Sequence, residues 1–140
     1  MNRTLAVLTL AGFALGTPSE AATGAAGFAE LFSERGTDTL TFHECTTRGR
    51  STPAEACATV SKAKFMTFRK DGSVKGRYFD RQLSGIWEID NIVCVIEDHG
   101  LGSGWHFKDG RYLVNESCDD NNLEVFVLAK QPAPARAARP

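Results

Sequence analysis

The stretch KFMTFRKDGSVKGRYF, residues 64–79, decides the fold class, because two short β-like segments flank a Lys-Asp-Gly turn. Gly72 can adopt the positive φ that the last position of a three-residue hairpin turn requires. With this turn Phe68 lies opposite Val74, so apolar side chains share one face of the strand pair. A two-residue turn would place Phe68 opposite Lys75 instead. We therefore predict an antiparallel hairpin with the three-residue turn.

Comparable segments continue on both sides of this hairpin. We expect about seven short strands between residues 39 and 129, mostly joined as hairpins. One of the joints, Asp90-Asn91, reads as a two-residue turn, which would place Trp87 opposite Cys94. The predicted fold class is mainly β: a small antiparallel meander that closes as a barrel or curls strongly.

An N-terminal helix is predicted to accompany the strands. Residues 25–35, AAGFAELFSER, place Phe28, Leu31 and Phe32 on one apolar stripe. Gly36 can provide a left-handed cap at the C-terminal end. A helix this short is stable only when docked, so we expect its stripe to plug or flank the sheet.

A second, shorter helix is predicted from Pro53 to about Val60. Thr52 is a good N-cap residue, Pro53 suits the first helical position, and Glu55 lies three residues after the cap. This helix would carry Cys57 near its C-terminal end.

The four cysteines, Cys45, Cys57, Cys94 and Cys118, predict disulfides that staple the domain. An even number of cysteines in a small exported domain is typical of a disulfide framework. Four cysteines allow three pairings, of which we favour Cys45–Cys57 and Cys94–Cys118, because each bond closes a short loop.

The N-terminus has the layout of a secretory signal. Arg3 gives a basic start, and an apolar run at residues 5–15 is shorter than the roughly 20 residues that span a bilayer. We therefore predict a signal peptide at residues 1–21 and a periplasmic or secreted protein. A single β-rich domain should follow at residues 22–130, and the Pro- and Ala-rich residues 131–140 predict a disordered tail.

The charge balance excludes several classes of partner. The chain has 16 basic and 17 acidic residues, a net charge of −1. No basic stripe indicates nucleic-acid binding, and no second long apolar run predicts a membrane span. We expect a monomer that binds an unknown small ligand or a cell-envelope protein.

The candidate site residues lie in the stretch IVCVIEDHGLGSGWHF, residues 92–107. Its glycine-rich loop and the strand after it offer His99, Leu101, Trp105 and His106 as binding residues. If the two aromatic neighbours of His106 face inward, His106 itself points outward. Surface histidines are common, so a binding role is favoured over a metal site.

A metal site is the alternative interpretation. It would use His99, His106 and nearby carboxylates, and His43 would have to converge with them. No spacing typical of a zinc site supports this alternative. We therefore predict no metal and no other cofactor.

Motifs of catalysis and of nucleotide binding are missing from the sequence. No Gly-x-Ser-x-Gly elbow occurs. The GLGSG segment is followed by Trp and His on a predicted strand, whereas a phosphate-binding loop continues with Lys and Ser or Thr into a helix. We therefore predict a protein that is not an enzyme.

Two motifs carry a resemblance to a known group. They are Phe68-Arg69-Lys70-Asp71-Gly72 with Gly76, and Gly85-Ile86-Trp87 with Cys94. In this order the chain resembles, over roughly residues 25–125, a group of small secreted proteobacterial proteins of unknown function. The resemblance implies export and a lipocalin-like β fold, and it implies no catalytic residues.

The expected function is that of an exported, disulfide-stabilised binding domain without catalysis. A small barrel mouth rimmed by aromatic residues would suit a small apolar or envelope ligand. Inhibition of a secreted hydrolase is a special case, in which the glycine-rich loop at residues 99–104 would protrude. The alternative is a periplasmic metal-binding protein or metal-dependent enzyme.

Overall fold

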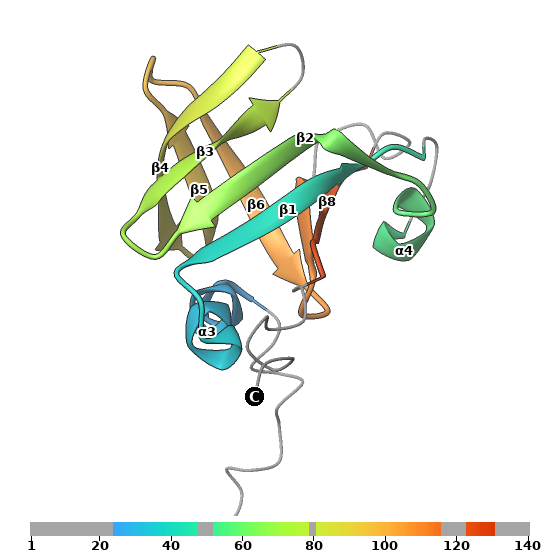
Figure 1. The fold of residues 1–140 in the computed structure, drawn as a ribbon, viewed down its shortest axis with the longest axis horizontal. Coiled ribbons are helices and arrows are strands. Elements are labelled where there is room, and N and C mark those ends of the chain that lie inside the picture. Colours follow the sequence, from blue (N-terminus) through green and yellow to red (C-terminus); the bar gives the residue numbers. More distant parts are fainter. Residues whose placement is uncertain (1–23, 48–51, 79–80, 116–122, 131–140) are drawn as a thin grey trace, which may run out of the picture.

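The computed structural model describes residues 24–47, 52–78, 81–115 and 123–130, whose strands form one closed antiparallel barrel (Figure 1). Each strand pairs with its neighbours in the chain, and the last strand pairs with the first. The strands are β1 (Thr39–Cys45), β2 (Val60–Arg69), β3 (Ser73–Tyr78), β4 (Arg81–Asp90), β5 (Ile92–Glu97), β6 (Gly102–Lys108), β7 (Tyr112–Asn115) and β8 (Glu124–Leu128). The predicted mainly β class is confirmed, with eight strands where about seven were expected.

Helix α3 (Ala25–Arg35) covers the end of the barrel at which β1 begins (Figure 1). The ring of Phe28 is fully buried and lies 5.8, 5.1 and 5.7 Å from the rings of Phe42, Phe68 and Phe107. Gly36 has a φ of 62° and ends the helix in the left-handed conformation. The predicted boundaries, apolar stripe and cap of this helix are therefore confirmed.

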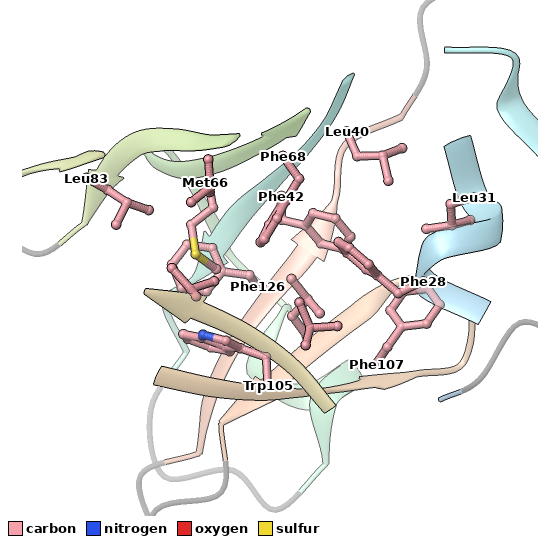
Figure 2. Close-up of a cluster of buried hydrophobic side chains, with 14 of the residues drawn as sticks. Phe28, Leu31, Leu40, Phe42, Met66, Phe68, Leu83, Trp105, Phe107 and Phe126 are labelled. Atoms are coloured by element: carbon pink, nitrogen blue, oxygen red, sulfur yellow. The ribbon is translucent and has the colours of Figure 1, made fainter. Parts of the chain in front are cut away.

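Side chains fill the interior of the barrel (Figure 2). Eight strands enclose a space just wide enough for side chains, and here aromatic residues occupy much of it. Phe68, Trp105 and Phe126 come from three strands, and their side chains have 0% exposure. Phe68 packs against Phe28 of the helix, whereas Trp105 lies farther from the helix and packs against Phe126 (Figure 2). The interior described here is therefore a packed core.

The hairpin of β2 and β3 has the predicted register. Phe68 pairs with Val74, and Gly72 has a φ of 100° in the turn. Gly76 brings these two strands into close approach, because a Cβ at this position would collide with the carbonyl oxygen of Phe65. A glycine in a strand often marks such a contact.

The predicted pairing of Trp87 with Cys94 is wrong by one residue. Trp87 lies opposite Val95, and the turn contains Asn91 with a φ of 68°. Because side chains alternate between the faces of a strand, one residue of shift moves a side chain to the other face. Trp87 therefore points inward and stacks on Phe32 at 5.7 Å, whereas Cys94 points outward.

A small external cluster holds helix α4 (Pro53–Ala56) against the outer face of β7 and β8. The amide of Glu55 donates to the Thr52 hydroxyl oxygen at 3.2 Å, which confirms the predicted N-cap. The helix is shorter than predicted, because Cys57 already forms its C-cap and β2 begins soon afterwards. Its packing partners are Tyr112, Val114 and Val125 from the two strands.

The predicted Cys45–Cys57 disulfide is confirmed, with 4.5 Å between the Cα atoms. It joins the end of β1 to α4. The predicted Cys94–Cys118 bond is contradicted at Cys94, which carries a free thiol, and Cys118 lies outside the described residues. Cys94 lies in an outward-facing position of β5, between the buried Val93 and Val95.

The predicted signal peptide at residues 1–21 and the predicted tail at residues 131–140 lie outside the described residues. Within the described part of the chain, neither helix has the length and apolar character needed to cross a membrane.

Candidate functional site

The end of the barrel opposite α3 is lined by polar side chains that face inward. We call this end the mouth and define it by Glu44, Tyr78, Arg81, Glu97 and Glu124. Each of these residues lies at a strand end, in the inward-facing positions of its strand. Glu44, for example, follows the buried Leu40 and Phe42 at the same alternation. The mouth is therefore a polar layer above an aromatic core.

Tyr78 forms the boundary between the core and the mouth. Its ring packs against Trp105 and Phe126 at 6.3 and 5.8 Å, and its hydroxyl donates to Glu124 Oε2 at 3.1 Å. Burial raises the pKa of Tyr78, and the charges of Glu124 and Glu44 raise it further. The phenol therefore stays protonated and acts as a hydrogen-bond donor.

The charge of Glu44 acts on Glu124 across the mouth. Burial raises the pKa of Glu124, the Glu44 charge adds to this, and the hydrogen bond from Tyr78 opposes it. Glu44 Oε1 is a buried atom, and no residue of the described chain donates a hydrogen bond to it. The Tyr78 hydroxyl therefore serves Glu124 and leaves Glu44 Oε1 without a donor from the described residues.

In a second group at the mouth, Arg81 balances the charge of Glu97. Glu97 is only 9% exposed and accepts hydrogen bonds from Arg81 Nη2 at 2.7 Å and, through its other oxygen, pairs with His99 Nε2 at 2.8 Å. The Arg81 guanidinium also lies 5.9 Å from the centre of the Tyr78 ring. Ion pairs of partly exposed side chains contribute little to stability, so the main effect of this group is to fix positions.

The connection between β5 and β6, which we call the β5–β6 loop (residues 98–101), lies beside the mouth. Its backbone is held at both ends: the Gly100 amide donates to the Glu97 carbonyl, and the Glu97 amide donates to the Leu101 carbonyl, each at 2.8 Å. Gly100 has a φ of 99°, which suits glycine. Leu101 is 60% exposed, more than any other large apolar side chain in the described residues.

The structure brings together only two of the four predicted binding residues. His99 and Leu101 share the β5–β6 loop. Trp105 is buried inside the barrel with 0% exposure, and its indole N–H donates to Ser103 Oγ at 2.9 Å. His106 lies on the outer face of β6 opposite Val114, as the alternation of the strand predicted. Contact of Trp105 with a partner would require opening of the core.

The alternative interpretation, a metal site, finds no matching geometry among the described residues. Among the described residues, no three His, Cys, Asp or Glu side chains converge closely enough to hold a metal ion. His99 is paired with Glu97, while His43 lies on β1 with its ring 6.4 Å from that of Phe65. The three histidines therefore belong to separate surroundings.

The residues of the mouth were not recognised from the sequence. A usable signal was nevertheless present, because Glu97 follows Val93 and Val95 at the inward alternation of β5. A charged residue that continues an apolar alternation at a strand end is a candidate for such a layer. Which strand ends meet could not be read from the chain, because closure of the barrel decides it.

Comparisons with known proteins give no match for this chain, whether against protein-family models, curated proteins or solved structures. The fold and the two features at the open end of the barrel, the mouth and the β5–β6 loop, therefore carry the functional argument.

Proposed function

We propose that this protein is an exported, disulfide-stabilised binding domain without catalysis, which binds a protein partner through the β5–β6 loop. The observation that carries the proposal is the exposure of Leu101 on a loop whose backbone is held by hydrogen bonds at both ends. A fixed loop loses little conformational freedom on binding, so more of the contact energy appears as affinity. An apolar side chain at such a tip suits a pocket on the partner.

The packed interior supports binding at the surface. Trp105 and Phe126 occupy space that a lipocalin-like protein would need for a ligand within the barrel. A small apolar ligand would have to displace these rings. We therefore favour a protein partner at the β5–β6 loop over a small apolar ligand at an aromatic barrel mouth.

The predicted signal peptide and the Cys45–Cys57 disulfide support export, because disulfides persist in oxidising compartments. The partner should then be an envelope or secreted protein. A secreted hydrolase with an apolar pocket in its active-site cleft fits this description, and the protein would act as its inhibitor.

The test is affinity capture from envelope extract, with quantification of every captured protein. The wild type is compared with Leu101→Ser and with Ile86→Ser, a matched control whose exposed apolar side chain lies on the outer face of β4. The partner should be enriched by the wild type and by Ile86→Ser and lost with Leu101→Ser. Equal recovery by all three proteins would exclude the loop as the binding surface.

The captured protein is then purified and titrated with the wild type and with Leu101→Ser. If the partner is a hydrolase, its activity should fall with the wild type and remain with the variant. Retained activity at saturating wild-type protein would leave a binding role and exclude inhibition.

A further inference from the structure

The outer face of strands β4, β5 and β6 carries apolar side chains that belong to no packed cluster. Ile86 on β4 is 51% exposed, and Ile96 lies opposite it on β5. Ile92 and Cys94 take the other outward positions of β5 and are half-buried. Neither apolar cluster of the described residues includes these side chains. We call this surface the β5 face and define it by its outward residues, which are Ile86, Glu88, Asp90, Ile92, Cys94, Ile96, Gly102, Gly104, His106 and Lys108.

Gly102 on β6 is a second, independent sign of a close contact on this face. A glycine weakens a strand and often marks a place that a ligand or another backbone approaches closely. The fold itself does not require glycine here, because its φ is not positive and a Cβ would meet only the Val95 carbonyl oxygen, at 3.6 Å. At Gly104, by contrast, Ile92 of the same chain already lies over the glycine. Gly102 therefore leaves open space beside Ile96.

The charges of the β5 face are divided between its two edges. Glu88 and Asp90 are exposed on β4, and they make one edge acidic. His106 and Lys108 point outward on β6, and they make the other edge basic. Cys94, opposite Glu88, lies in the apolar strip between the two edges. The face is therefore complementary in charge to a copy of itself that is turned edge for edge.

A twofold axis that runs along β5 produces this arrangement, because it places β4 of one copy over β6 of the other. Ile86 of one copy then meets the open space at Gly102 of its partner, since both residues pair with the same residue of β5. Asp90 meets His106, which is the next outward residue of β6 after Gly104. An axis across the strands would bring Glu88 against Glu88, two like charges, and is therefore disfavoured.

We propose that the β5 face is the interface of a symmetric homodimer with its twofold axis along β5. The monomer expected from the sequence is then one half of this dimer. The face spans only three strands, and small interfaces are weak, so association depends on concentration. This inference goes beyond the proposed function and does not depend on the partner of Leu101.

The first experiment is sedimentation velocity of the purified protein over a range of concentrations. We expect a monomer–dimer equilibrium for the wild type and a monomer for Ile86→Glu, because the new charge would lie inside the interface. Val60→Glu is the matched control, since Val60 is 41% exposed and lies on β2, outside the β5 face. A wild type that stays monomeric, or equal dimer fractions in the two variants, would overturn the proposal.

Chemical cross-linking at Cys94 tests the position of the axis without altering the interface. The Cys118→Ser variant leaves Cys94 as the only thiol besides the Cys45–Cys57 bond. A short bis-maleimide should join two copies of this variant, which mass spectrometry under denaturing conditions detects as a doubled mass. The control adds Cys94→Ser and Lys75→Cys, so that the thiol lies on the exposed outer side of β3. Equal dimer yields at equal labelling would contradict the proposed axis.

An exchange of charges tests the pairing of the two edges. His106→Glu places an acid opposite Asp90 of the second copy, so the dissociation constant of the dimer should rise several-fold. The effect is modest because exposed pairs are weak, but symmetry repeats it twice. Adding Asp90→Lys restores opposite charges and should return the dissociation constant toward the wild-type value. Such a recovery cannot come from a loss of folding, and its absence would overturn the proposed arrangement.

Discussion

The two ends of the barrel are built from the same eight strands and differ in what their inward side chains do. At the α3 end, Phe28 joins the rings of Phe42 and Phe68 in a core that excludes water. At the mouth, Glu44 and Glu124 occupy equivalent inward positions, and neither forms an ion pair with a basic side chain of the described residues. The aromatic core is therefore concentrated at one end of the barrel, and polar inward side chains at the other.

Removal of the ring at the centre of the α3 end should have the largest effect. We expect Phe28→Ala to lower the free energy of unfolding by about 3–5 kcal/mol, because it leaves a cavity among five aromatic rings. Urea unfolding measures the change. Glu30→Ala, on the exposed face of the same helix, is the control and should change little. Similar losses for both variants would show that α3 does not dock through Phe28.

The disulfide comes next in expected effect. Cys45 and Cys57 are 12 positions apart, and replacing both by Ser should cost roughly 3 kcal/mol, since the unfolded chain gains freedom. Cys94→Ser is the matched control, because this free thiol faces outward on β5. Thermal unfolding of the wild type, the Cys45/Cys57 double variant and Cys94→Ser measures the two losses of stability. A large loss with Cys94→Ser would indicate a bond that the described structure does not contain.

At the mouth we expect a substitution to raise the free energy of unfolding instead of lowering it. Glu44→Gln removes the charge of a half-buried side chain whose Oε1 atom receives no hydrogen bond from the described residues, so we expect the free energy of unfolding to rise by about 1 kcal/mol. Urea unfolding of wild type and variant at neutral pH and low salt provides the measurement. A clear loss of stability would mean that Glu44 is already compensated, and the contrast between the two ends would disappear.

The smallest effect is a pH dependence carried by Glu124. Its pKa is raised in the folded protein, so the folded state holds this proton more tightly than the unfolded state. The resulting stabilisation is complete below the ordinary glutamate pKa of 4.5 and is lost as the pH rises through the raised value. Thermal unfolding of wild type and Glu124→Gln across this range should show a difference that changes with pH. A constant difference would contradict the raised pKa.

Local features of the chain were predictable because neighbouring residues decide them. Gly36 ended α3 where the sequence indicated, since a left-handed cap depends on one glycine. The register of Phe68 with Val74 followed from the turn and the apolar pairing. The same reasoning gave the wrong register for the hairpin of β4 and β5, because Asn91 allowed a pairing that is shifted by one residue. Packing of Trp87 on the helix favours the observed register.

The candidate site was predictable only in part, for a related reason. His99 and Leu101 lie in one loop and could be grouped from the sequence. Trp105 was also singled out, yet its strand turns it into the core, because every second residue of β6 faces inward. The carboxylates of the mouth escaped notice because each appears singly in its own strand.

The sequence by itself determined the β class, helix α3 with its cap, the β2–β3 hairpin and the Cys45–Cys57 bond. All of these depend on residues close together in the chain, whose turn and helix preferences act locally. Only the tertiary structure decided that Glu44, Tyr78 and Glu124 meet, because these residues come from the first, third and last strands. Closure of the barrel brings the three strand ends together, and burial at that end then raises the pKa of Tyr78 and of Glu124.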